Sequence, residues 1–188
     1  VGCGGIRSAA GVPVLIVPLP PELLAASGVP ELPEQYQRRP KLEAAHRVEL
    51  LRTENMTITA RTTGLSGAAG AGKSSTAAVL ARDVHVQTHF PDGIVWLAFG
   101  RERSGAQGLR TLAERLGVVA VAHEELHPTI SRALVGKRRL LVLDDIWTRE
   151  QLNAFSALTA VGGLLGRLVT TRSHELAGEH NLAVTSLK

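Results

Sequence analysis

Short apolar runs alternate with amphipathic stretches along most of the chain. Gly93 to Phe99 (GIVWLAF) and Leu140 to Leu143 (LLVL) are continuous apolar runs, which is typical of strands covered on both faces. Three further segments have the same short, β-prone character and are expected to be strands: Met56 to Ser66, Leu168 to Thr171 and Leu182 to Leu187. The pattern therefore predicts four or five buried strands.

Helical spacing fills the intervals between these strands. Leu42, Ala45, Val48 and Leu51 recur on one face of a helix that should end before Asn55. Four further helices are predicted by similar spacing or by end signals: Lys73 to Asp83, a stripe formed by Leu109, Leu112, Ala113 and Leu116, Pro128 to Gly136, and Glu150 to Leu158. Alternating strands and helices predict the α/β class with a parallel, doubly wound sheet.

The N-terminal segment has a different composition. Residues 1–34 are rich in Gly, Pro and Ala, and their prolines block any long helix. We expect a linker or arm over 1–34 and one folded domain over 35–188. Because the chain begins with Val1 and ends soon after a strand-like segment, we also expect it to be part of a longer polypeptide, with the domain truncated at its C-terminal end.

Composition and charge narrow the class of partner. Hydrophobic residues make up 44% and charged residues 20%, ordinary values for a folded protein. The net charge is +4, but the basic residues are scattered and lack interleaved aromatics, so no nucleic-acid partner is expected. The dense run Lys137 to Arg139 is interpreted as the solvated C-terminus of a helix.

Two further observations bear on compartment. The single cysteine, Cys3, excludes an internal disulfide framework, and a reducing cytoplasm fits best. The longest apolar stretch, Val12 to Pro20, is too short to span a bilayer and is broken by prolines. No membrane partner is therefore expected.

A glycine-rich loop carries the clearest chemical signal. Gly67 to Ser74 (GAAGAGKS) matches the P-loop pattern, in which glycines let backbone amides close around a phosphate. Lys73 would contact the β and γ phosphates, the Ser74 hydroxyl would hold Mg²⁺, and the following helix would direct its N-terminus at the same anion. A strand precedes the loop and a helix follows, as the motif requires. We therefore expect ATP or ADP with Mg²⁺, on a three-layer P-loop NTPase fold.

Two other strands are predicted to deliver polar groups to the same edge of the sheet. The LLVL strand ends in Asp144 and Asp145, and ligands of open α/β sheets bind at such C-terminal ends. Asp144 is the natural Mg²⁺ partner, and Asp145 is the candidate for orienting or deprotonating the attacking water. Arg172, after the strand LVTT, could reach the γ phosphate.

Together these motifs resemble the NB-ARC family, the STAND-class ATPases found in plant disease-resistance proteins and apoptotic protease-activating factors. The resemblance runs from Tyr36 to Lys188. Four segments carry it, in the family's order: LSGAAGAGKSS (Leu65 to Ser75), FPDGIVWLAFG (Phe90 to Gly100), KRRLLVLDDIW (Lys137 to Trp147) and GRLVTTRS (Gly166 to Ser173). It implies a Mg²⁺ role for Asp144, a catalytic base at Asp145 and a γ-phosphate sensor at Arg172.

The resemblance also assigns the rest of the site. Arg39, followed by Leu42, matches an arginine near the nucleotide base, although Gln37 and Arg38 replace an apolar and a small residue. Trp96 and Trp147 match aromatic positions that we interpret as packing. The expected catalytic residues are Lys73, Asp145 and Arg172; the metal ligands are Ser74 and Asp144; and the nucleotide-binding residues are Gly67, Ala68, Ala69, Gly70, Ala71, Gly72, Lys73, Ser74, Ser75 and Arg39.

Three functions remain open from sequence alone. The first is a signalling switch in which ATP binding and slow hydrolysis control homo-oligomerisation and protein partners of a larger protein. The second is a P-loop enzyme of steady turnover, such as a AAA-type motor or a small-molecule kinase. The third is a module that holds ADP structurally without hydrolysis. The LVLDDIW and TTR segments favour the switch.

Overall fold

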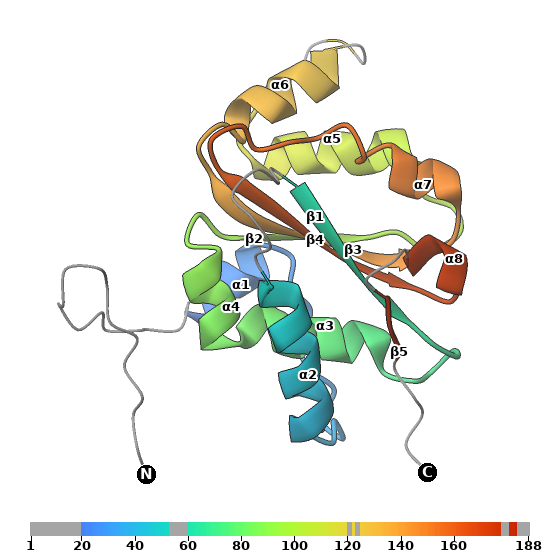
Figure 1. Ribbon diagram of the computed structural model, residues 1–188. Helices are drawn as coiled ribbons and strands as arrows, with labels where there is room; N and C mark the ends of the chain where they lie inside the picture. The colour runs from blue at the N-terminus through green and yellow to red at the C-terminus, as the bar shows by residue number, and fades with distance from the viewer. Residues whose placement is uncertain (1–19, 53–59, 120–121, 123–124, 178–180, 184–188) are drawn as a thin grey trace, which may run out of the picture.

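Five parallel strands form one sheet, in the order β2-β3-β4-β1-β5. The structure is a computed structural model that describes residues 20–52, 60–119, 122, 125–177 and 181–183. The strands are β1 (Ala60–Ser66), β2 (Ile94–Ala98), β3 (Arg138–Ile146), β4 (Leu164–Thr171) and β5 (Asn181–Ala183). This arrangement confirms the predicted α/β fold with a parallel sheet (Figure 1).

Helices cover both faces of the sheet, as predicted for a doubly wound fold (Figure 1). One layer contains α1 (Pro21–Ala26), α2 (Pro40–Leu51), α3 (Lys73–Arg82) and α4 (Val84–His89). The other contains α5 (Gly105–Arg115), α6 (Leu126–Ala133) and α7 (Arg149–Asn153), and the short α8 (His174–Ala177) packs beside β1 and β4.

Side-chain alternation along β3 divides the core into two clusters. Leu140 and Val142 pack with α3 on one face, whereas Leu141 and Leu143 pack with α5 and α6 on the other. All four are at most 1% exposed. Because consecutive strand residues point to opposite faces, a continuous apolar run is what a doubly covered strand requires.

Several boundaries differ from the sequence prediction. β3 and β4 each extend beyond their apolar runs, α6 begins two residues earlier than expected, and α7 ends at Asn153 rather than Leu158. The helices α4 and α8 were not predicted as separate elements. Part of the first predicted strand, 56–59, and most of the last, 184–187, lie outside the described residues.

The described part of the segment expected as a linker packs against the domain. Leu24 and Val29 are 6% and 4% exposed and belong to the core cluster around α3. The carbonyl of Ser27 accepts a hydrogen bond from the amide of Trp96 at 2.9 Å. Residues 20–30 therefore differ from the expected arm, because two apolar side chains and a backbone contact bind them to the β2 edge of the sheet.

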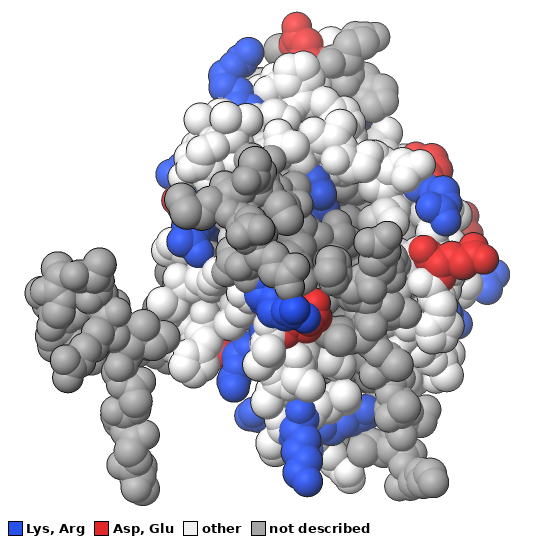
Figure 2. Space-filling view, viewed as in Figure 1, with Lys and Arg blue, Asp and Glu red and all other residues white. Residues whose placement is uncertain are grey.

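The basic run Lys137 to Arg139 is not the end of a helix, so that interpretation was wrong. α6 ends at Ala133, and Arg138 and Arg139 begin β3. The carboxylate of Asp92 accepts from Lys137 Nζ at 3.1 Å and from the amide of Arg138 at 2.8 Å. On the face seen in Figure 2, Lys and Arg side chains are dispersed. None of the described helices is long and apolar enough to cross a membrane.

Candidate functional site

The glycine-rich loop joins the end of β1 to the start of α3. Gly70 and Gly72 have φ values of +74° and +87°, a left-handed conformation that glycine adopts without steric cost. Gly72 is the N-cap of α3, whose ten residues begin at Lys73. The unpaired amides of the first helical turn therefore face the loop, as an anion-binding site requires.

Lys73 is folded along this loop. It is 8% exposed, and its Nζ donates to the carbonyl oxygens of Gly67 and Ala68, both at 2.8 Å. Burial lowers the pKa of Lys73; the positive charge of Arg172 lowers it further, and the carboxylates of Asp145 and Asp144 oppose the shift. The ammonium thus lies within electrostatic reach of every other charged group of the site.

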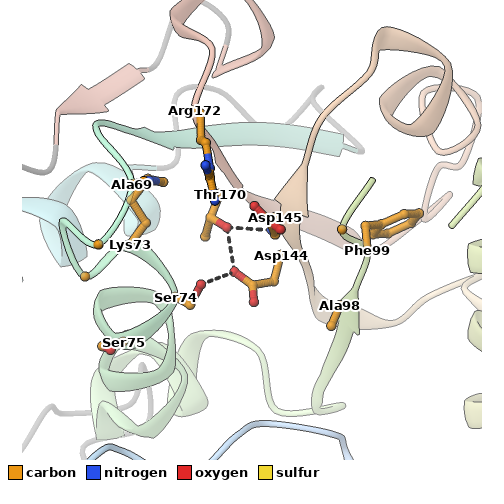
Figure 3. A pocket seen from close by; sticks show the side chains of 13 residues that line it. Ala69, Lys73, Ser74, Ser75, Ala98, Phe99, Asp144, Asp145, Thr170 and Arg172 are labelled. Atoms are coloured by element: carbon orange, nitrogen blue, oxygen red, sulfur yellow. Dashed lines mark hydrogen bonds between the residues drawn. The ribbon is translucent and has the colours of Figure 1, made fainter. Parts of the chain in front are cut away.

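A hydrogen-bonded chain links α3, β3 and β4 (Figure 3). Asp144 Oδ1 accepts from Ser74 Oγ at 2.7 Å and from Thr170 Oγ1 at 2.5 Å. Thr170 Oγ1 in turn accepts from the amide of Asp145 at 2.8 Å. Burial raises the pKa of Asp144 above the ordinary aspartate value, although the two hydroxyl donors partly offset it. A cation placed beside Ser74 and Asp144 would stabilise the ionised form.

These groups surround one cavity of about 550 Å³. The predicted residues that line it are Ala69, Gly70, Gly72, Lys73, Ser74, Ser75, Asp144, Asp145 and Arg172. Gly67, Ala68 and Ala71 belong to the same loop but are not among its lining residues. The lining residues that sequence reasoning missed are Ala98, Phe99, Gly100 and Thr170. Only their position in the sequence could have identified them, because all four lie at or beyond the C-terminal ends of β2 and β4.

Arg39 contacts the glycine loop without lining the cavity. Its Nη2 donates to the carbonyl of Ala71 at 3.0 Å, and its own amide donates to Glu43 Oε1 at 2.8 Å. Glu43 also accepts from Arg38 Nε and from the hydroxyl of Tyr36, both at 2.9 Å. Burial raises the pKa of Glu43, but these donors outweigh it and hold the pKa below its usual value. Glu43 thereby fixes the segment that carries Arg39.

Arg172 is exposed and follows β4 directly. Its guanidinium carbon lies 4.4 Å from the centre of the Trp147 ring, so Trp147 does more than fill space at the strand edge. Stacking restrains a long side chain that would otherwise be free to rotate.

The donor chemistry suits a polyphosphate with Mg²⁺. Ser74 and Asp144 present hydroxyl and carboxylate oxygens, which are the hard ligands that Mg²⁺ prefers, and Mg²⁺ usually takes few protein ligands. The described part of the chain contains no group of three or more His, Cys, Asp or Glu residues that could hold a metal. Lys73, Arg172 and the N-terminus of α3 supply positive charge to the same cavity that the two acids line.

Comparison with known sequences gives one consistent result. Residues 43–187 match the sequence model of the NB-ARC domain. Apoptotic protease-activating factor 1 is 31% identical over 170 residues in Danio rerio and 32% identical over 164 residues in Homo sapiens, covering 82% and 80% of this chain. A probable disease resistance protein of Arabidopsis thaliana is 33% identical over 93 residues, 50% of this chain. The chain spans only 13%, 12% and 11% of these relatives.

Comparison with solved structures supports the fold alone. Cdc6p from Pyrobaculum aerophilum aligns with a TM-score of 0.55 and 15% identity, over 86% of this chain and 48% of that one. The Orc1 protein of Aeropyrum pernix, solved in complex with DNA, aligns with a TM-score of 0.54 and 16% identity, over 83% of this chain and 47% of that one.

Proposed function

The chain belongs to the NB-ARC domain family, and from that premise we propose that it binds ATP or ADP with Mg²⁺ in the cavity beside the P-loop and works as a nucleotide-operated switch. The observation that carries the proposal is the set of hydrogen bonds that joins Ser74 to Asp144 and Asp144 to Thr170. It brings a hydroxyl and a buried carboxylate to the start of the helix that the glycine loop opens.

Each residue of the proposed binding site would have one task. The loop amides and Lys73 Nζ would bind the β and γ phosphates, and Lys73 would exchange its two carbonyl acceptors for phosphate oxygens. Ser74 and Asp144 would hold Mg²⁺, which when bound neutralises charge on those phosphates. Arg39 would hold the glycine loop in place through its hydrogen bond to the carbonyl of Ala71. Arg172, at the cavity rim, would contact the γ phosphate and so distinguish ATP from ADP.

Hydrolysis would be slow and would depend on Asp145. Its carboxylate would orient a water and accept a proton as the water oxygen attacks the γ phosphorus and the bond to the bridging oxygen breaks, giving ADP and inorganic phosphate. We propose that this change of bound nucleotide controls homo-oligomerisation and protein contacts of a longer cytoplasmic protein. The support is membership of the NB-ARC family.

Calorimetry with ADP, ATP and GTP, with and without Mg²⁺, tests the binding proposal. Lys73→Ala should weaken ATP binding at least about tenfold, because charge-assisted hydrogen bonds contribute roughly 1.5 to 3 kcal/mol each and about 1.4 kcal/mol is tenfold in affinity. The matched control is Lys41→Ala, which removes an exposed lysine of α2. Equal ATP affinity in the two variants would show that Lys73 does not bind the nucleotide and would overturn the P-loop assignment.

Turnover separates the switch from the alternatives. A kinase or motor would run at about 1 per second or faster, whereas a switch should be orders of magnitude slower. Asp145→Asn should abolish the slow hydrolysis and leave ADP affinity nearly unchanged. Identical hydrolysis by Asp145→Asn and the unmodified chain would favour a structural ADP module.

A further inference from the structure

Trp147 lies where three neighbouring strands end. It follows β3 directly, Arg101 lies just beyond β2, and Arg172 follows β4. Since β3 is the middle strand of the three, the residue after it is flanked by the segments that leave the other two. The sheet order therefore brings both arginines to one indole.

Both guanidinium groups contact that ring. The Cζ atom of Arg101 lies 4.1 Å from the ring centroid, and that of Arg172 lies 4.4 Å from it. Both distances are well inside the roughly 6 Å range of cation–π attraction. Trp147 Nε1 is buried without a hydrogen-bond partner in the described part of the chain, so its side chain is held by stacking rather than by a polar contact.

A buried glutamine fixes the backbone around this stack. Gln151 is 1% exposed. Its Oε1 accepts from the amide of Trp147 at 2.8 Å, and its Nε2 donates to the carbonyls of Gly100 at 2.8 Å and Arg103 at 2.7 Å. Gln151 thereby ties the backbone of the loop that carries Arg101 to the backbone of Trp147, the residue on which Arg101 stacks.

We propose that Trp147 is a positioning residue that holds Arg172 at the cavity rim, ready for a γ phosphate, with Arg101 as a second cation on the same ring. The inference rests on the proposed function, because it assigns Arg172 to the triphosphate. Arg172 lines the cavity while it is stacked, so the stacked position is the competent one. Trp147 thus favours ATP over ADP without touching either nucleotide.

The stack can be tested without nucleotide. The chain has two tryptophans, so incorporation of 5-fluorotryptophan gives two fluorine resonances, and Trp147→Leu identifies one of them. Arg172→Ala and Arg101→Ala should each shift the Trp147 resonance and leave that of Trp96, which is buried at 3% exposure, in place. Two resonances unmoved by either substitution would overturn the stacking and the proposal.

The positioning role is tested by affinity for ADP and for a non-hydrolysable ATP analogue, both with Mg²⁺. Trp147→Leu should weaken the ATP analogue by about two- to fivefold and leave ADP unchanged, because loss of the ring frees Arg172. Trp147→Phe keeps an aromatic face and should restore most of the affinity. Urea unfolding verifies that both variants are folded.

The outcomes separate the inference from the function on which it rests. Selective loss in the Leu variant with rescue in the Phe variant supports the positioning role. An equal loss for both nucleotides, or no loss, overturns it while leaving nucleotide binding intact. If the unmodified chain binds neither nucleotide, both the proposed function and the positioning role are wrong. The fluorine shifts would still show whether the two arginines stack on Trp147.

Discussion

Thr170 offers the sharpest test of how the site is built. It is 1% exposed in β4, donates its hydroxyl proton to Asp144 Oδ1 at 2.5 Å and accepts from the amide of Asp145 at 2.8 Å. Valine has nearly the same shape and no hydroxyl. Thr170→Val therefore removes both hydrogen bonds while leaving the volume of the side chain almost unchanged.

The expected cost follows from those two contacts. A hydrogen bond to a charged group contributes roughly 1.5 to 3 kcal/mol, and a buried amide left without an acceptor costs roughly 1 to 3 kcal/mol. With partial relaxation we expect a loss of about 2 to 4 kcal/mol in the free energy of unfolding. For a chain of this length that corresponds to a fall in Tm of about 4 to 16 °C.

Urea unfolding without nucleotide measures the effect, and Thr170→Ser is the control. Serine keeps the hydroxyl and loses one buried methyl group, so it should cost only about 1 kcal/mol. The valine variant should also lose affinity for Mg²⁺ with ATP, because the backbone of Asp145 and the carboxylate of Asp144 are no longer joined. If valine proves as stable as serine, Thr170 does not organise the two acids.

Two further predictions follow from the shifted pKa values. Burial raises the pKa of Asp144, so the stability that its protonated form contributes is present at low pH and is lost as pH rises through the folded-state pKa. Asp144→Asn should therefore raise Tm at neutral pH in Mg²⁺-free buffer, by about 2 to 4 °C for each kcal/mol gained in the free energy of unfolding, and it should abolish Mg²⁺-dependent ATP binding. An unchanged or lower Tm would contradict the burial cost. Burial and Glu43 raise the pKa of Tyr36, the sole tyrosine, to about 12; an alkaline absorbance titration should give that value and a lower one, still above 10.0, in Glu43→Gln, and identical titrations would refute the contact.

The strands were predictable from sequence in their cores and not at their ends. The run Leu140 to Leu143 identified β3 because both faces of that segment are covered. Yet β3 begins at Arg138, which pairs with Leu164 of β4. Backbone pairing continues wherever a neighbouring strand offers partners, whatever the side chain, so polar strand ends leave no apolar signal.

The packing of residues 20–30 could not be predicted for a similar reason. Six residues of α1 are too few to show a helical stripe, and the prolines on either side are typical of linkers. What places the segment is contact with residues distant in sequence, such as the hydrogen bonds from the amide of Trp96 to Ser27 and from Arg82 Nη2 to Pro30. Such long-range contacts are set by the tertiary fold.

The residues of the candidate site were likewise predictable only where local sequence determines their role. The glycine loop, the Asp pair and Arg172 were predicted because their residue types are restricted by local chemistry, and the structure brings members of all three to one cavity. Thr170 and the stacking of Trp147 were missed because their roles depend on which residues of three strands end side by side. A threonine or a tryptophan in a β-prone segment is ordinary in itself.

The two acids could not serve one site if β3 were regular. Consecutive strand residues point to opposite faces, so Asp145 would turn away from Asp144. The pairing of β3 with β4 shifts between Leu143 and Ile146, and Asp145 has φ +56°, the single positive value for a non-glycine among the described residues.

Such a conformation costs roughly 1 to 2 kcal/mol. It persists because both backbone groups of Asp145 are bound: its amide donates to Thr170, and its carbonyl accepts from the amide of Gly100 at 3.1 Å. Strain of this kind survives where surrounding contacts fix it, and it is concentrated at functional sites. The bulge turns an alternating strand into a pair of carboxylates that line the same cavity, with that of Asp144 hydrogen-bonded to Ser74.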